Sequence, residues 1–174
     1  MIEKIEGLGL SNPSLLTDIK WLELELLAAQ KNISLLAQQI NDGVTFDPSH
    51  EAHKQYFTGL IKAASNDPTA RENLYLAAKL NPFYEDAVIA SVNYISALDK
   101  FEAYDLLVSA LDINPYSVPL LKAYILQCAR VQLNNYADLS LESLRGLVSS
   151  QEFQAFYSQY AVLVQQVEAE ENEF

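Results

Sequence analysis

The chain has 174 residues, of which 50% are hydrophobic, so it can bury a core and is too apolar for a disordered chain. Five glycines and six prolines are fewer than a β-sandwich or a glycine-rich nucleotide site normally uses, which favours helix. Eleven basic against 23 acidic residues leave a net charge of −12, so nucleic acid and anionic membrane surfaces are not expected as partners.

The N-terminal segment contains neither a secretory signal nor a membrane-spanning pattern. Residues 1–7 include two acids and no long apolar run, and the most apolar stretch, 21–29, contains Glu23 and Glu25. We therefore expect a cytoplasmic protein by default. If the chain is cut from a larger exported protein, its compartment is unknown.

Apolar residues recur every three or four positions along most of the chain, which is the spacing of amphipathic helices. The breaks between these segments predict nine helices. They group into four hairpins and a final helix, all in one domain over 1–170: hairpins about 14–43, 49–80, 84–113 and 117–149, and a helix over 151–170. The acidic residues 171–174 are expected to fray.

Turn-forming residues mark the expected helix ends. Gly43 is predicted to end the first hairpin, because glycine accepts the left-handed conformation that a helix end needs. Asp47-Pro48 is predicted to begin the second hairpin. A tight turn is expected at Asp99-Lys100, and Asn134-Asn135 is predicted to separate the last hairpin's helices, so that the second begins at Tyr136.

Small residues repeat within this pattern. Ala70, Ala77 and Pro82 are spaced by seven and then five residues, and the same spacings separate Ala103, Ala110 and Pro115. Seven residues make two helical turns, so both alanines of each pair lie on one helix face and allow a neighbouring helix to approach closely. The two prolines are 33 residues apart, a period typical of stacked helical hairpins.

At these residues the chain resembles the tetratricopeptide repeat (TPR) family. That family's second helix has two small residues two turns apart, and its motif ends in an apolar residue, any residue and then Asp/Asn-Pro. The endings in this chain read Lys79-Leu80-Asn81-Pro82 and Asp112-Ile113-Asn114-Pro115. The resemblance covers about residues 48–133 and fades beyond them, since Leu144 and Ser149 stand where Ala and Pro are expected. It implies an all-α fold of TPR-like stacked hairpins, an α-solenoid. An irregular helical bundle is the alternative.

Few residues in this chain suggest catalysis or metal binding. His50 and His53 share a helix face, but a closed metal site needs two more ligands, so we expect two solvated histidines. Cys128, the only cysteine, lies in an apolar helix and is expected to be buried and inert. There is no phosphate-binding loop and no nucleophile–base pattern. We expect no enzyme activity, no metal and no cofactor.

The resemblance implies a function in binding. In TPR proteins the first helices of successive hairpins line a concave groove that holds a peptide or a helix of a partner. Carried over to this sequence, the groove-lining positions are Asp86, Ile89, Asn93, Ser96, Pro119, Lys122, Leu126 and Arg130. Three of these side chains, on Asn93, Lys122 and Arg130, are suited to hydrogen-bonding an extended backbone or a carboxylate. The expected function is a non-catalytic scaffold for a protein partner of unknown identity.

The family's carboxylate clamp is not expected, because Gln55 and Phe57 stand where it needs basic and amide groups. Near the C-terminus, a stripe of apolar residues at helical spacing predicts a helix that caps the last hairpin: Phe153, Phe156, Tyr157, Tyr160, Val164 and Val167. The alternative is a self-associating structural domain, in which this stripe and Trp21 form the seam of a homodimer.

Overall fold

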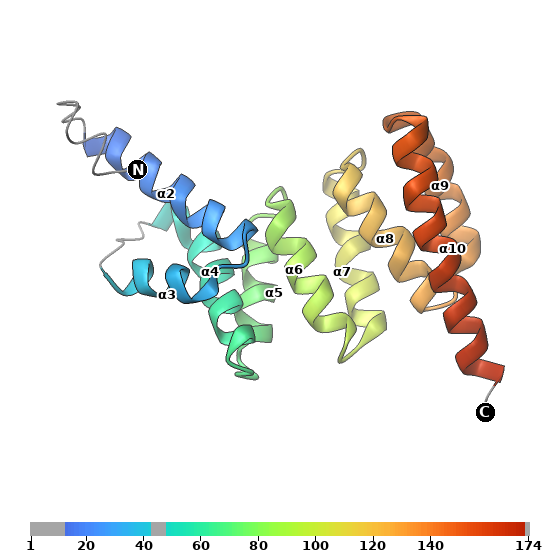
Figure 1. The fold of residues 1–174 in the computed structure, drawn as a ribbon, viewed down its shortest axis with the longest axis horizontal. Coiled ribbons are helices and arrows are strands. Elements are labelled where there is room, and N and C mark those ends of the chain that lie inside the picture. The colour runs from blue at the N-terminus through green and yellow to red at the C-terminus, as the bar shows by residue number, and fades with distance from the viewer. Residues whose placement is uncertain (1–12, 43–47, 173–174) are drawn as a thin grey trace.

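A computed structural model describes residues 13–42 and 48–172, and in this part of the chain the fold is all-helical (Figure 1). The described residues form nine α-helices and one short 3-10 helix, η1 (Pro48–His50), with no strand. The helices are α2 (Pro13–Ala29), α3 (Ile33–Asn41), α4 (Glu51–Ala64), α5 (Ala70–Leu80), α6 (Glu85–Ser96), α7 (Lys100–Ile113), α8 (Val118–Arg130), α9 (Asn134–Leu147) and α10 (Ser150–Asn172). The predicted all-α class is confirmed. Gly43 and Asp47, predicted as helix-end residues, lie outside the described residues.

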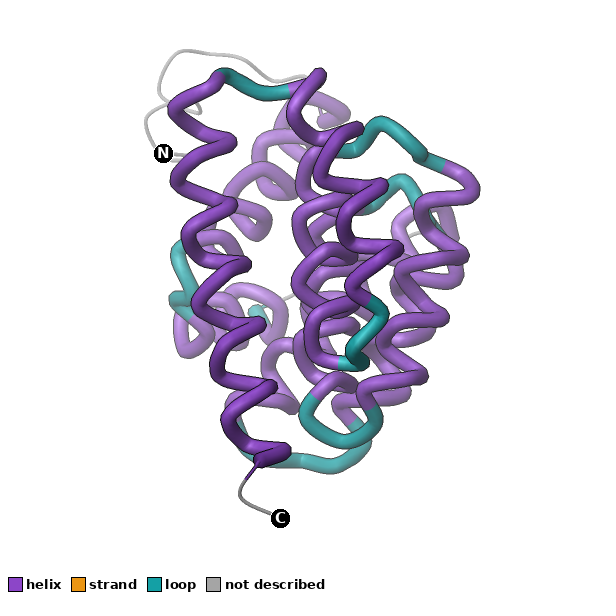
Figure 2. Tube along the Cα trace, turned by 90° about the vertical axis from the view of Figure 1, so that its right-hand side faces the viewer, coloured by secondary structure: helices purple, strands orange, loops and turns teal. Residues whose placement is uncertain are grey.

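Each helix packs against its neighbours in the chain, and the pairs follow one another along the long axis of the molecule (Figure 1). Contacts also join helices two apart, namely α4 with α6, α6 with α8, and α8 with α10. Seen from the C-terminal end, most of the helices run roughly along one common direction (Figure 2), while α3 lies across them (Figure 1). None of the helices in the described ranges is long and apolar enough to cross a membrane.

Three of the turns between paired helices have the same backbone geometry. Lys31, Asn66 and Gln132 adopt positive φ angles of 56°, 57° and 62°. After each of them, the next residue's N–H bonds a carbonyl five residues back: Asn32 to Leu27, Asp67 to Lys62, and Leu133 to Cys128. This is the Schellman helix end, which satisfies carbonyls that the helix leaves open. The left-handed residues are 35 and then 66 positions apart, by subtraction of their numbers.

The turn between α6 and α7 is built differently, and it lies at 97–99, so that Lys100, predicted to be part of the turn, already begins α7. The Asp99 side chain accepts hydrogen bonds from the N–H groups of Phe101 and Glu102, both at 3.0 Å, and so caps the first turn of α7. The predicted break at Asn134-Asn135 is wrong. The turn lies at 131–133, and Asn134 already begins α9, because Gln132 supplies the left-handed conformation that ends α8.

The core consists of two hydrophobic clusters. The first joins α2 to α6 around Leu24, Leu36, Phe57 and Leu74, and the second joins α5 to α10. The four alanines at matched spacings are all buried: Ala70, Ala77, Ala103 and Ala110. Their burial lets neighbouring helices approach closely, as the sequence predicts.

Candidate functional site

A hollow lies between α4 and α6, beside the turn that joins α2 to α3. It has a volume of about 670 Å³, and its walls are mostly apolar, with Ile33, Tyr56, Leu60 and Tyr94 among them. Three predicted groove residues, Asp86, Ile89 and Asn93, line it from successive turns of α6. We call it the N-terminal hollow.

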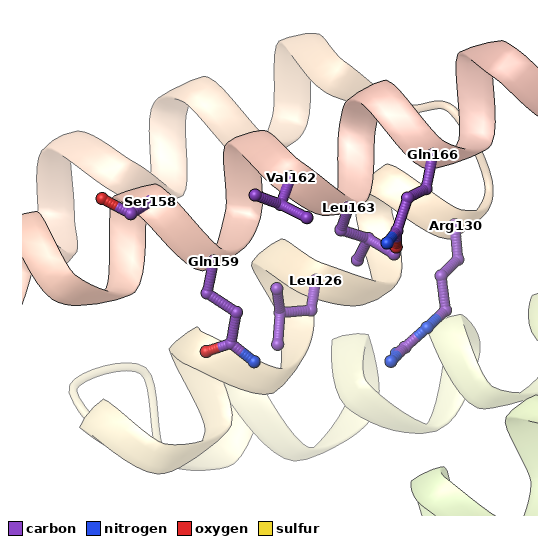
Figure 3. A pocket seen from close by; sticks show the side chains of 7 residues that line it. All are labelled: Leu126, Arg130, Ser158, Gln159, Val162, Leu163 and Gln166. Atoms are coloured by element: carbon purple, nitrogen blue, oxygen red, sulfur yellow. The ribbon is translucent and has the colours of Figure 1, made fainter.

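A second hollow, of about 450 Å³, lies between α8 and α10 and is called here the C-terminal hollow (Figure 3). Two further predicted groove residues, Leu126 and Arg130, line it from α8. Opposite them α10 contributes Ser158, Gln159, Val162, Leu163 and Gln166. Figure 3 shows Leu126 and Leu163 between the polar ends of Gln159 and Arg130.

The remaining predicted groove residues lie outside both hollows. The Lys122 ammonium forms an ion pair with Glu152 at 2.6 Å and lies 5.8 Å from the centre of the Phe156 ring, so its charge joins α8 to α10. Ser96 donates a hydrogen bond to Gln127 at 2.9 Å. Pro119 is exposed in the first turn of α8. The predicted set is thus divided between two hollows and the contacts between helices.

Gln127 is a fully buried polar residue that the sequence analysis did not select. Its side-chain oxygen accepts from Ser96 and from Arg130, and its side-chain nitrogen donates to the Lys100 carbonyl at 2.6 Å. A buried amide needs such partners, and this one links α6, α7 and α8. Glutamine in an apolar helix carries no distinctive sequence pattern, so its role emerges only from the packing.

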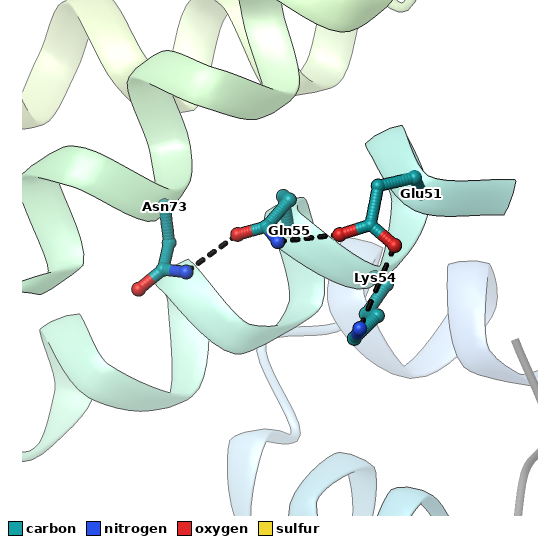
Figure 4. A network of polar contacts seen from close by, with 4 residues as sticks. All are labelled: Glu51, Lys54, Gln55 and Asn73. Carbon is teal, nitrogen blue, oxygen red and sulfur yellow. Dashed lines mark hydrogen bonds and ion pairs between the residues drawn. The ribbon is translucent and has the colours of Figure 1, made fainter. Parts of the chain in front are cut away.

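Gln55 and Phe57 serve the packing of α4 rather than a clamp for carboxylates. Gln55 donates to Glu51 at 2.6 Å and accepts from Asn73, which joins α4 to α5 (Figure 4). Lys54 extends this network by pairing with Glu51 at 3.5 Å. Phe57 is fully buried. Both side chains are therefore occupied within the chain.

The two histidines lie in an aromatic cluster, so the expectation that they are simply solvated is wrong. The His50 ring stacks on Trp21 with centroids 4.3 Å apart, and the His53 ring lies 4.6 Å from Tyr84. His53 Nε2 lies 3.5 Å from Glu25 Oε1, which also accepts a 2.6 Å hydrogen bond from the Tyr84 hydroxyl. Within 13–42 and 48–172, no three His, Cys, Asp or Glu side chains are grouped as a metal site would require.

Burial affects the protonation of this cluster. It holds the pKa of His53 below its ordinary value, with the nearby His50 acting in the same direction. Burial also raises the pKa of Glu25. The hydrogen bond from Tyr84 lowers this pKa and the negative charge of Asp86 raises it, but burial has the largest effect. Protonation of His53 therefore favours the unfolded chain, so stability falls as pH decreases through about 6.5, the usual value for histidine.

When the pH is lowered from about 7.5 to about 5.5, we predict that the free energy of unfolding decreases less in a His53→Gln variant than in the wild type. Glutamine cannot take up the proton, so the variant lacks the part of the loss that comes from His53. Urea unfolding followed by circular dichroism at the two pH values measures the difference. Equal losses in both proteins would show that His53 does not titrate within this window.

Cys128 is fully buried in α8, as expected, and burial raises the pKa of its thiol to about 11. The thiol therefore stays protonated at neutral pH, which is the unreactive form.

The C-terminal stripe is largely covered within the chain. Phe153, Phe156 and Tyr160 are buried against the second cluster, while Tyr157 is half-exposed. The helix that carries them, predicted for 151–170, continues to Asn172. It contacts α8 more extensively than α9. The sequence predicts that α10 only caps the last hairpin, so the predicted groove positions include none of the α10 residues that line the C-terminal hollow.

No protein-family model, no curated protein and no solved structure matches this chain.

Proposed function

We propose that the chain is a non-catalytic interaction scaffold of TPR-like stacked hairpins, and that it binds a peptide or a helix of a partner protein. The helix pairs would form the hairpins, and α4, α6, α8 and α10 would line the binding face. The contacts of these helices with one another and the recurring Schellman turns support this arrangement.

The observation that carries the proposal is the N-terminal hollow. It is mostly apolar, its volume of about 670 Å³ suits several side chains, and Asp86 and Asn93 offer polar groups at its edge. Asp86 and Asn93 are both exposed, and the Asp86 side chain makes no hydrogen bond or ion pair with the described part of the chain. A partner can therefore bury apolar side chains there and satisfy these two groups.

A homodimer through Trp21 and the C-terminal stripe has less support. Trp21 packs against His50 and Phe57, and the most buried stripe residues contact other helices of the same chain. Dimerisation through these groups would require their present contacts to be broken.

The test is a selection of displayed peptides on the whole chain, followed by binding measurements with Ile89→Glu. A carboxylate in the apolar wall should weaken binding of the selected peptides by about tenfold or more. Leu139→Glu is the matched control, because Leu139 is an exposed leucine on α9, away from the hollow. If no peptide is selected, or if both variants bind alike, the proposed binding face is wrong. A concentration-independent dimer in light scattering would favour the alternative.

A further inference from the structure

Arg130 differs from the chain's other two arginines in having no acidic partner. Arg71 pairs with Glu102, and Arg145 pairs with Glu142 at 3.0 Å. Both are exposed, whereas Arg130 is half-buried and has no carboxylate of the described residues within ion-pair distance. Its hydrogen bond from Nη1 to Gln127 Oε1, at 3.1 Å, occupies one of the five N–H donors of a guanidinium.

The absence of a counter-charge is costly at this position. Burial lowers the pKa of Arg130, which means that its surroundings do not compensate the positive charge. The residues that line the C-terminal hollow include no aspartate or glutamate, although the chain has 23 of them. Lys100, whose ammonium donates to the Arg130 carbonyl at 3.3 Å, adds a second positive charge nearby.

An apolar surface adjoins this charge. Leu126 precedes Arg130 by one helical turn, and Leu163 of α10 lies against the same space, with the Gln159 amide at the other end (Figure 3). Along the hollow lie, in order, the Arg130 guanidinium, the apolar side chains of Leu126 and Leu163, and the Gln159 amide.

We infer that the C-terminal hollow binds an acidic side chain of a partner helix, whose carboxylate contacts Arg130 while a neighbouring apolar side chain packs on Leu126 and Leu163. This rests on the proposed function and adds the chemistry of the partner. An acidic and an apolar residue four positions apart on a helix reproduce the spacing of Arg130 and Leu126. The planar guanidinium can hold the two carboxylate oxygens with parallel hydrogen bonds.

The probe is a library of helices of about 15 residues, displayed within a helical-bundle carrier so that both ends are tied and no terminal carboxylate is offered. The library is selected separately on the wild type, on Arg130→Gln and on Arg145→Gln. When the library is selected on the wild type or on Arg145→Gln, we expect the selected helices to be enriched in Asp or Glu four positions from an apolar residue. This enrichment should be absent on Arg130→Gln.

Individual helices from the wild-type pool should bind Arg130→Gln about tenfold to a hundredfold more weakly, and Arg130→Lys with an intermediate loss. Circular dichroism melts establish that each variant is folded. If the library yields binders without acidic enrichment, or with the same enrichment on Arg130→Gln, this inference fails while the scaffold function stands. If the selected sequences bind only when they are released from the carrier as free peptides, the carboxylate belongs to a chain terminus and the inferred partner is wrong. A library with no binders would overturn the inferred partner helix, while the peptide selection described above tests the scaffold function separately.

Discussion

Phe57→Ala should destabilise the protein by about 3–5 kcal/mol, the usual cost of removing a buried aromatic ring. Phe57 is fully buried in the first hydrophobic cluster, among Leu24, Leu36 and Leu74. The ring centre lies 6.1 Å from that of Trp21 and 5.5 Å from that of Tyr56. Its removal leaves a cavity shared by α2, α3, α4 and α5, which these short helices cannot close without losing their mutual contacts.

The single tryptophan makes the location of this loss measurable. Trp21 packs against the first cluster, so its fluorescence reports on that cluster, while far-UV circular dichroism reports on all helices. In urea, Phe57→Ala should shift the fluorescence transition further than the circular dichroism transition, because parts of a structure that pack around different buried residues can open separately. Leu144→Ala is the control. Leu144 is fully buried in the second cluster, so the order of the two shifts should reverse. Coincident transitions in both variants would show that the two clusters unfold as one unit.

Helices and their order follow from the sequence because the signals that define them are local. Asp99 caps α7 through its own side chain, and Ser117 caps α8 in the same way, with its oxygen accepting from the Leu120 N–H at 3.2 Å. The alanines at spacings of seven are buried because their small size fits the close approach of two helices. Each of these effects acts within a turn or two of the residue that causes it.

The left-handed conformation at Lys31 and Gln132 was harder to predict than that at Asn66. Glycine and, less often, asparagine mark a left-handed helix end, whereas Lys31 and Gln132 have longer side chains, for which this conformation is unfavourable. For this reason the sequence predicts the α8–α9 break at Asn134-Asn135 instead of at Gln132.

The candidate site could be predicted in part. The α6 positions Asp86, Ile89 and Asn93 line one hollow together because residues three or four apart share a helix face. The partner of Lys122 could not be predicted, since Glu152 lies 30 residues away on a helix interpreted as a cap. The lack of a carboxylate partner for Arg130 is also a property of the tertiary structure, because it depends on which residues of α10 lie beside Arg130.

Gly59→Leu should cost about 3 kcal/mol, at the upper end of the usual cost of overpacking. Gly59 is buried in α4, and a Cβ atom at this position would lie 2.7 Å from Leu74 Cγ and 3.1 Å from the Leu74 backbone nitrogen. Real Cβ atoms do not approach other carbons so closely, and the backbone of α5 cannot yield without moving the helix. The glycine therefore sets the distance between α4 and α5.

Gly146 provides the matched control for Gly59→Leu. It is an exposed helical glycine near the end of α9, with nothing within 4 Å of the position that a Cβ would occupy. Gly146→Leu should therefore raise stability by up to about 0.8 kcal/mol, because leucine is the better helix former. Opposite signs for the same substitution would separate the effect of packing from that of helix propensity.

A double mutant then tests whether Leu74 is the group that Gly59 accommodates. Leu74→Ala alone should cost about 2–5 kcal/mol, since it leaves a cavity beside α4. In Gly59→Leu/Leu74→Ala the new leucine has room in that cavity, so the double mutant should be more stable than the sum of the single effects implies, by about 1–3 kcal/mol. Urea unfolding of the four proteins gives this coupling energy directly. Additive losses would mean that α4 and α5 adjust independently and that their spacing is set elsewhere.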